Sequence, residues 1–337
     1  MMPKITLRIE VVRSSNKSLS SMGEVSARDI VTTLSRHYSD VVMTNVDTVQ
    51  DLEALLARKP GLVFAGIYFV RDESRGGEKV WLTDALEQHG IAYTGSGQQA
   101  NRLSLNKDLA KQRVSEHGVR TASFKLAACN DVMAISAGDL LFPLFVKPSN
   151  KNGRQGVDTF SVVHTIAQLQ KKVHSIHADY KADALVEEYL SGREFTVAVL
   201  GDLDNGFIAM PFELIAAKDS NGDRIRSNIL GTSDADDMLA IADSHEQLLL
   251  KTLAIDAFRA LGGIGYGRID IRFNELGEAF FLEANHIPSL NRAHSTFPKA
   301  YDITFGLNYE ALIMHIAKLG IEHRATTPIR SVPSLTF

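Results

Sequence analysis

Two neighbouring segments near the C-terminus carry side chains that could hold a divalent cation. Arg268 and Asp270 share the polar face of one alternating segment, and after a turn signal at 274–277, Glu283 and Asn285 share that of a second. An even-numbered loop places Arg268 opposite Glu283 and makes the two acids diagonal neighbours, about 7–8 Å apart. An odd loop without a bulge puts them on opposite sides of the sheet. Two carboxylates and a neutral oxygen are what Mg²⁺ takes from a protein when it also binds water and phosphate. The segments therefore predict a magnesium site, with a solvated strand face as the alternative.

A second candidate site begins at Lys147, which ends an apolar strand. The polar loop after it contains Gly153 and Gly156. Glycines let backbone N–H groups approach a phosphate closely, and Lys147 adds a positive charge beside them. The spacing differs from that of a Walker A loop, which needs Gly-Lys-Ser/Thr at the start of a helix. A nucleotide-binding loop and a plain β-hairpin both remain open on this evidence.

A third candidate site lies where an apolar strand ends in acids. Glu187 closes the strand, Tyr189 and Leu190 follow it, and Glu194 comes after a glycine turn. Carboxylates there could accept hydrogen bonds from an adenine amine or from ribose hydroxyls, and Tyr189 or Leu190 could cover a purine face. The alternative is a set of acids on an exposed strand end.

Helical and strand periodicity indicates the elements that position these residues. From residue 4 to about 95, strand-like and helix-like segments alternate, which predicts a small doubly wound parallel sheet. Its predicted strands are 5–12, 41–46 and 62–67, and its predicted helices are 25–38, 49–58 and 81–89. The middle part has a helix at 104–117, strands at 144–147 and 159–163, and a helix at 166–176. The last part has strands at 184–189, 194–200 and 206–213, a long helix ending at 261, the two strands above and a helix at 309–319.

Composition limits the class of protein. A chain of 337 residues is long enough for two or three domains, and the net charge of −4 argues against a general nucleic-acid or membrane partner. Cys129 is the only cysteine, which excludes an intrachain disulfide and fits a reducing cytosol. No apolar stretch reaches membrane-spanning length, and the N-terminus is too polar for a signal peptide. We expect a cytoplasmic protein.

The order of the three sites resembles that of the ATP-grasp superfamily, and most closely the D-alanine–D-alanine ligases. The likeness extends to Gly90-Ile91-Ala92-Tyr93-Thr94-Gly95-Ser96-Gly97, to Leu105-Asn106-Lys107 and to Pro298-Lys299, so it covers nearly the whole chain. It implies an ATP-grasp fold in which an N-terminal parallel sheet precedes two α+β subdomains that sandwich ATP. The expected divisions are a substrate-side domain at 1–97, a central subdomain at 98–183, a metal-binding subdomain at 184–325 and a loosely held tail at 326–337.

The resemblance also implies a reaction. ATP phosphorylates a carboxylate, and an amine attacks the acyl phosphate to give an amide, ADP and phosphate, with a small-molecule carboxylate and amine as partners. Carried over by motif position, Lys107 and Lys147 would contact the nucleotide phosphates, Glu187 and Leu190 would hold the adenine with Tyr189 beside it, and Glu194 would bind the ribose. Asp270, Glu283 and Asn285 would hold two Mg²⁺ ions, for which Mn²⁺ could substitute. Arg268 would stabilise the negative charge that develops in the reaction. Phosphoryl transfer depends mainly on positioning and charge neutralisation, which such a set supplies. A homodimer is one candidate assembly.

The sequence departs from the family pattern on the side that selects the substrate. Met22 stands where the family has an acid, although Glu24 is close by. Gly153 replaces a serine of the glycine loop, Ser289 replaces a glycine after the metal site, and the motif of the mobile loop has no counterpart at 219–228. These differences predict that ATP activation is kept while the D-alanine pocket is lost.

Basic residues could take over substrate recognition. Arg154, Arg224 and Arg226 could pair with carboxylates or a phosphate of a more anionic substrate, because guanidinium binds such groups bidentately. They could equally be solvated or serve ATP. His294 and Ser295 occupy the segment that lines the acceptor site in the family, and Glu78, Met22, Glu24 and Ser289 complete the substrate-side candidates.

Three functions remain in competition. The first is an ATP-dependent carboxylate–amine ligase with altered specificity, which could act in specialised-metabolite biosynthesis, or a genuine D-alanine–D-alanine ligase of the cell wall. The second is an ATP-grasp phosphotransferase that releases the phosphorylated group as its product. The third is a nucleotide-binding regulator without turnover, against which the intact Arg268, Asp270, Glu283 and Asn285 set argues.

Overall fold

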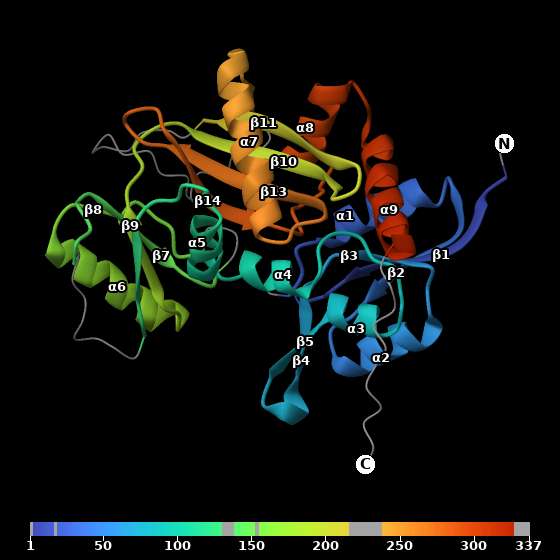
Figure 1. Cartoon of the computed structure of the whole chain (residues 1–337). Coiled ribbons are helices and arrows are strands. Elements are labelled where there is room, and N and C mark those ends of the chain that lie inside the picture. Colours follow the sequence, from blue (N-terminus) through green and yellow to red (C-terminus); the bar gives the residue numbers. More distant parts are fainter. Residues whose placement is uncertain (1–2, 17–18, 130–137, 152–154, 216–237, 327–337) are drawn as a thin grey trace.

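The computed structural model describes residues 3–16, 19–129, 138–151, 155–215 and 238–326, with the backbone alone for 324–326. The chain forms a parallel three-stranded sheet, a four-stranded sheet and a five-stranded sheet, with a two-stranded hairpin beside the first (Figure 1). These layers agree with the predicted combination of α/β and α+β parts. Within these residues, no helix combines the length and apolar character that a membrane span requires.

The N-terminal sheet is parallel because a helix separates each strand from the next. Its strand order is β2–β1–β3, and the predicted elements of this region are confirmed with small shifts at their ends. They are β1 (Ile5–Arg13), α1 (Glu24–Leu34), β2 (Tyr38–Asn45), α2 (Val49–Arg58), β3 (Leu62–Ala65) and α3 (Leu82–Gln88). Thr48 and Asp51 form a reciprocal capping box at the start of α2, which satisfies backbone donors that its first turn leaves free.

A hairpin that the sequence analysis does not predict follows β3. Its strands are β4 (Phe69–Asp72) and β5 (Glu78–Trp81), and the 3₁₀ turn η1 (Glu73–Arg75) joins them. The Asp72 side chain accepts from Ser74 N at 3.0 Å and so fixes this turn. Each strand is only four residues long, which leaves too little alternation to recognise. In Figure 1 the hairpin projects from the N-terminal part below α4 (Gln98–Ser104).

The four-stranded sheet has the order β6–β9–β7–β8. Its strands are β6 (Phe124–Ala127), β7 (Leu144–Pro148), β8 (Val162–Val163) and β9 (Ala184–Glu188), and α6 (Ile166–Tyr180) packs against it. The sequence groups β9 with the strands that follow, but its hydrogen bonds are to β6 and β7. Hydrogen bonding in a sheet depends on strands that meet in space rather than on neighbouring strands in the chain. The helix predicted at 104–117 is confirmed as α5 (Lys107–Glu116), and a further helix that the sequence analysis does not predict, α4, precedes it.

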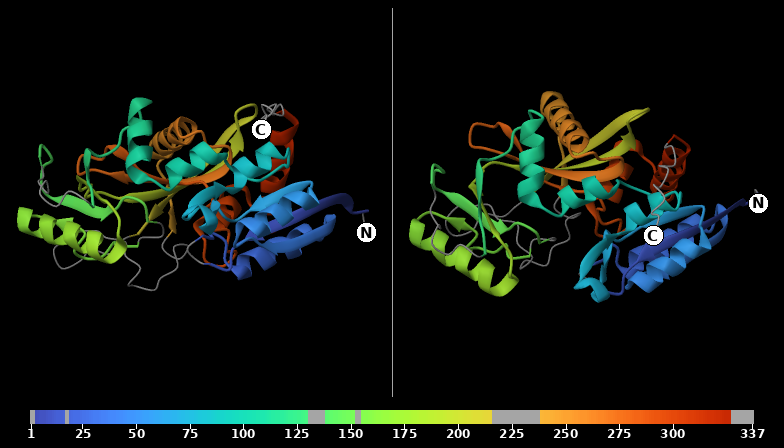
Figure 2. Two further views of the ribbon diagram at one scale, coloured as in Figure 1. Left: turned by 90° about the horizontal axis from the view of Figure 1, so that it is seen from below. Right: turned by 60° about the horizontal axis from the view of Figure 1, so that its bottom comes forward.

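The five-stranded antiparallel sheet has the order β12–β11–β10–β13–β14. Its elements are β10 (Glu194–Asp202), β11 (Gly206–Leu214), β12 (Met238–Ala240), β13 (Gly265–Phe273) and β14 (Ala279–Asn285), with α7 (Ser244–Ala260), α8 (Thr296–Phe305) and α9 (Tyr309–Thr326) packed on it. Val197 and Val199 of β10 belong to the core under α7. Ala198 and Leu200 point to the other face, where α8 and α9 lie. That second core continues into the N-terminal sheet, so α9 lies beside the first strands of the chain (Figure 2).

The pairing of β13 with β14 differs from the predicted one. Asp270 lies directly opposite Glu283 rather than diagonal to it, and Arg268 lies opposite Asn285. The loop from residue 274 to 278 is odd-numbered, which by itself would send the acids to opposite faces. A bulge at Leu282, between the paired positions of Phe281 and Glu283, restores a shared face.

We predict that Gly192 is required for the connection between β9 and β10. An added Cβ would lie 2.6 Å from Phe273 O and 2.7 Å from Asn274 O, which are backbone atoms that cannot move aside cheaply. Gly192→Ala should lower the free energy of unfolding by about 1–3 kcal/mol, measured by urea denaturation. The exposed neighbour Ser191 provides the control, since Ser191→Ala should change it by no more than about 0.5 kcal/mol. Equal stability of the two variants would contradict the prediction.

Candidate active site

A polar patch occupies the part of the five-stranded sheet that α7 does not cover. Arg268 and Asp270 of β13 share this face with Glu283 of β14. Arg268 Nη2 lies 2.8 Å from Asp270 Oδ2, and Thr196 Oγ1 of β10 donates to Asp270 Oδ1 at 3.0 Å. The structure therefore brings together the two acids and the arginine that the sequence analysis places here.

Two carboxylates directly opposite each other repel, and neighbouring cations offset that repulsion. Burial raises the pKa of Asp270, and the charge of Glu283 adds to the rise while Arg268 opposes it. Burial would also raise the pKa of Glu283, but Lys107, Lys147 and Arg268 outweigh it and lower that pKa. Lys107 Nζ lies 3.6 Å from Glu283 Oε2. The pair is thus held with one carboxylate strongly anionic and the other more easily protonated.

Asn285 is anchored to the N-terminal part of the chain. Its Oδ1 accepts from Tyr68 OH at 3.1 Å and from Ile287 N at 3.0 Å. Ser104 at the end of α4 donates to Ala284 O at 3.1 Å. These bonds tie the end of β14 to Tyr68 and to α4, which both come much earlier in the sequence.

The acids of this face fit a divalent cation that is shared with phosphate. Asp270 and Glu283 offer carboxylate oxygens on facing positions, and a cation between them would relieve their repulsion. Asn285 fits less directly, because its oxygen already accepts two hydrogen bonds. In the part of the chain that the structure describes, no three His, Cys, Asp or Glu side chains are grouped to hold a metal. Water and phosphate oxygens would have to complete the coordination.

Glu187 joins two lysines in the interior. Glu187 Oε1 lies 2.7 Å from Lys147 Nζ, and Glu187 Oε2 lies 2.7 Å from Lys111 Nζ. Burial alone would raise the pKa of Glu187, but the two ammonium groups lower it to about 2. Lys111 is fully buried and also donates to Thr121 Oγ1 at 2.8 Å. Glu187 is therefore a permanently charged acceptor beside Lys147.

The residues predicted around a nucleotide base lie beside Glu187. The Tyr189 ring stacks on Phe145 at 6.5 Å between centroids, and its hydroxyl accepts from Arg272 Nη2 at 3.3 Å. Arg272 Nη1 also lies 3.7 Å from Glu194 Oε2. Leu190 is buried next to Tyr189. The aromatic rings, Leu190 and the two acids thus lie together where the four-stranded and five-stranded sheets approach each other.

The glycine loop is described in part. Gly156 has a φ of +77°, and a Cβ there would lie 2.6 Å from Pro148 Cγ, so glycine is needed at this position. Its carbonyl accepts from the buried Lys172 Nζ at 3.0 Å. Gly153 and Arg154 lie outside the described residues, as do Arg224 and Arg226 of the 216–237 segment.

The substrate-side candidates of the N-terminal part have different surroundings. Met22 is buried in the core beside Gly66, whose added Cβ would lie 2.7 Å from the Met22 Cβ. Glu24 begins α1, and its exposed carboxylate pairs with Arg28 one turn later. Glu78 is exposed at the start of β5, opposite Asp72.

The loop after β14 groups the remaining candidates. Ser295 Oγ donates to Ser289 Oγ at 2.7 Å, and His294 N donates to Asn291 Oδ1 at 3.0 Å. His286 directly follows Asn285 in the sequence, where a histidine could act as a base, but it is fully buried with its ring edge-on to Phe258. Burial lowers the pKa of His286 to about 4, which favours a neutral core residue over a base.

Sequence analysis misses several residues that complete the site. Lys111 lies one helical turn after Lys107, a spacing that could have placed both on one face of α5. Thr196 and Arg272 have no such signal, because only strand pairing brings Thr196 to Asp270 and Arg272 to Glu194. Tyr68 contacts Asn285 through a tertiary approach that no local pattern encodes.

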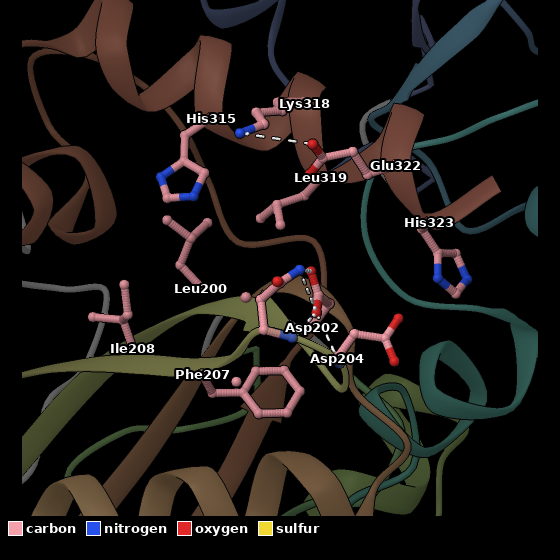
Figure 3. Close-up of a pocket in the computed structure, with 13 residues that line it drawn as sticks. Leu200, Asp202, Asp204, Phe207, Ile208, His315, Lys318, Leu319, Glu322 and His323 are labelled. Carbon is pink, nitrogen blue, oxygen red and sulfur yellow. Dashed lines mark hydrogen bonds and ion pairs between the residues drawn. The ribbon is translucent and has the colours of Figure 1, made fainter. Parts of the chain in front are cut away.

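A separate cavity of about 380 Å³ lies at the other end of β10 (Figure 3). The turn between β10 and β11 and the helix α9 line it, with Asp202, Phe207 and His315 among the residues. Lys318 and Glu322 of α9 form an ion pair at 3.6 Å on its rim. None of the predicted site residues lines this cavity, so we assign the chemistry to the Asp270–Glu283 face instead.

Comparisons with known proteins agree with this geometry. The family model of the D-Ala-D-Ala ligase C-terminus matches residues 114–318. A D-alanine–D-alanine ligase B of Xanthomonas campestris is 32% identical over 78% of this chain and 79% of its own. The chain belongs to the D-alanine–D-alanine ligase family. It is an ATP-grasp ligase of the ADP-forming type.

Two further comparisons widen this family picture. An uncharacterized protein, y4sG, of Sinorhizobium fredii is 33% identical over 80% of this chain and 76% of its own. The crystal structure of the Bacillus anthracis D-alanine–D-alanine ligase complexed with ATP superposes with a TM-score of 0.73, covering 95% of this chain and 99% of that one at 18% identity. This likeness confirms the predicted ATP-grasp fold.

The charge state of Glu187 gives a prediction for this ligase. Its pKa of about 2 lies below the unfolded value of about 4.3, so its stabilising contribution is complete above the unfolded pKa and is lost as the pH falls toward 2. Removing the charge with Glu187→Gln should therefore lower the free energy of unfolding by at most about 3 kcal/mol at pH 5–7, and by less at pH 3. Urea denaturation at pH 7, 5 and 3 measures it. Glu53→Gln, at an exposed position of α2, is the control. If the stability difference between wild type and Glu187→Gln did not change with pH, the lowered pKa of Glu187 would be contradicted.

Proposed function

We propose that this chain is an ATP-dependent carboxylate–amine ligase that forms an amide through an acyl phosphate and uses substrates other than D-alanine. The observation that carries the proposal is the convergence of Lys107 and Arg268 on Asp270 and Glu283 at one face of the sheet. Such a face neutralises phosphate charge while keeping acids for divalent cations, which is what phosphoryl transfer to a carboxylate requires. Synthesis of a specialised metabolite is the use we infer.

The nucleotide would lie between the four-stranded and five-stranded sheets. Glu187 would accept from the adenine amine, with Leu190 and Tyr189 against the ring and Glu194 at the ribose. Without a nucleotide, Lys147 forms an ion pair with Glu187. When ATP binds, the Lys147 ammonium could turn toward a phosphate, because Lys111 would still neutralise the charge of Glu187. Gly153 and Gly156 of the loop would complete the phosphate contacts.

The reaction would take place beside Arg268. Asp270 and Glu283 would hold two Mg²⁺ ions, which supply charge neutralisation on the phosphates when bound, and Asn285 would join them once its oxygen gives up a hydrogen bond from Tyr68 or Ile287. The substrate carboxylate takes the terminal phosphoryl group of ATP and ADP leaves. The amine then attacks the acyl carbon, and phosphate leaves as the amine loses a proton. Arg268 would stabilise the negative charge that develops in both steps.

The surroundings of the substrate-side residues support altered specificity. A buried Met22 cannot supply the charge that an acid at this position would offer to an ammonium group, and the Glu24 carboxylate is engaged with Arg28. Arg154, Arg224 and Arg226 are cations that could take a substrate with more negative charge. His294, Ser295 and Ser289 would line the acceptor side, with Glu78 further out. We also infer that the substrates are small molecules, and a homodimer remains a prediction for the assembly.

One experiment tests this function against its alternatives. ADP release is measured over pairs of L- and D-amino acids and other carboxylates, and the products are identified by mass spectrometry. An amide product from substrates other than D-alanine supports the proposal. Fast turnover with D-alanine alone would instead identify a D-alanine–D-alanine ligase, and a phosphorylated product without amine consumption would identify a phosphotransferase.

Removing one carboxylate of the facing pair tests the metal site. Glu283→Gln should leave the protein folded and reduce Mg²⁺-dependent ADP release at least about a hundredfold, because it removes a charge that would hold the cation. Glu278→Gln is the matched control, since Glu278 adjoins the same hairpin but pairs with Arg120 at the surface. Most of the activity remaining in Glu283→Gln would rule out the metal assignment.

A further inference from the structure

The β4–β5 hairpin separates its charges by sign. Arg71 lies directly opposite Lys79 on one face, and Asp72 lies directly opposite Glu78 on the other. Facing strand residues of like charge are unfavourable, whereas a cation opposite an acid would be stabilising. The hairpin therefore keeps two cations together at an energetic cost.

Aromatic rings hold both cations in place. Lys79 Nζ lies 4.7 Å from the Phe69 ring centroid and 5.9 Å from that of Trp81, and Arg71 Cζ lies 5.6 Å from the Phe69 centroid. Arg71 Nη1 also donates to Gly77 O at 3.0 Å, which orients the guanidinium. These contacts fix the position of the charges without neutralising them.

A third cation comes from a different element. Partial burial lowers the pKa of Lys79, and the positive charges of Arg71 and of Arg102 on α4 lower it further. Among the residues that the structure describes, no carboxylate lies within ion-pair distance of Arg71, Lys79 or Arg102. Arg102 thus adds a third positive charge close enough to be felt at Lys79, and in the described part of the chain none of the three cations forms an ion pair.

The base of the hairpin connects this place to the candidate active site. Phe69 and Trp81 pack with Leu105 and Ile287 in one small apolar cluster. Leu105 is two residues before Lys107, and Ile287 is two residues after Asn285. Arg71 lies two residues beyond Phe69, about 7 Å further along the strand. The two cations of the hairpin therefore lie one short strand away from a cluster that adjoins the candidate active site.

We propose that Arg71, Lys79 and Arg102 form an anion-binding site that takes a second negatively charged group of the ligase substrate, a carboxylate or a phosphate. The role in substrate choice rests on the proposed ligase function, whereas the binding of an anion does not. Guanidinium groups bind carboxylate and phosphate oxygens in pairs, and lysine adds a point charge. This assignment explains why the hairpin carries the like-charged pair.

Direct binding can be measured without turnover, because Trp81 is the only tryptophan in the chain and lies beside Lys79. Fluorescence is followed while inorganic phosphate or succinate is titrated at constant ionic strength, with Mg²⁺ and ADP present to occupy the nucleotide site. Wild type should show a saturable change in fluorescence. The Arg71→Gln/Lys79→Gln double variant should reach half-saturation only at an anion concentration about tenfold higher or more. Arg75→Gln, on the same hairpin but paired with Asp72, should match wild type. The stronger of the two ligands identifies the anion class.

Turnover provides the second measurement. Glutamate is compared with glutamine, and phosphoserine with serine, by their KM values in ADP release. The double variant should raise KM for the acidic substrate about tenfold or more and leave KM for ATP unchanged. Arg102→Gln, on a separate element, should act in the same direction even if the hairpin variant fails to fold.

The outcomes separate the two proposals. Absence of a saturable fluorescence change, or an equal change in the double variant, overturns the anion site even when ADP release is normal. A saturable change that the double variant loses supports the site, even if no substrate pair yields ADP and the ligase function fails. Acidic and neutral substrates that respond equally to the double variant would overturn the role in substrate choice.

Discussion

The organisation of this protein depends on two carboxylates that face each other across β13 and β14. Asp270 and Glu283 share a face only because a bulge corrects an odd-numbered loop. Their repulsion is large in a partly buried place and requires nearby positive charge. Arg268 supplies it from the same strand, and Lys107 supplies it from a helix outside the sheet. The surrounding elements place these cations next to the two carboxylates.

Helix α5 links the two sheets that would enclose a nucleotide. Lys107 points to Glu283 of the five-stranded sheet, and Lys111, one turn later, points to Glu187 of the four-stranded sheet. The buried Lys111 is stable in charged form only with Glu187, because an unpaired ammonium in the interior is costly. The two sheets are thus coupled through ion pairs on a single helix face. Lys147 of the four-stranded sheet pairs with the other carboxylate oxygen of Glu187.

The packing of the apolar cores limits where the charged face can lie. Helix α7 covers one side of the five-stranded sheet completely enough to bury Val197 and Val199, while α8 and α9 cover the other side near Ala198 and Leu200. The polar end of that second side, at Thr196, is left for the site. The same core ties α9 to the N-terminal sheet, which brings Tyr68 and the hairpin after it to Asn285.

The sequence by itself determined most of the order of elements, the fold family and the identity of the charged residues, because strand alternation, helix spacing and ATP-grasp motifs are local patterns, whereas the short β4–β5 hairpin was missed. It placed Asp270, Glu283 and Arg268 on one face but gave the wrong pairing, since a bulge leaves little trace in residue types. The membership of β9 in the four-stranded sheet, the Glu187–Lys111 pair and the contact of Tyr68 with Asn285 were decided only by the tertiary structure. Each joins segments that are distant in the chain, and their approach follows from the packing of whole layers rather than from any local preference.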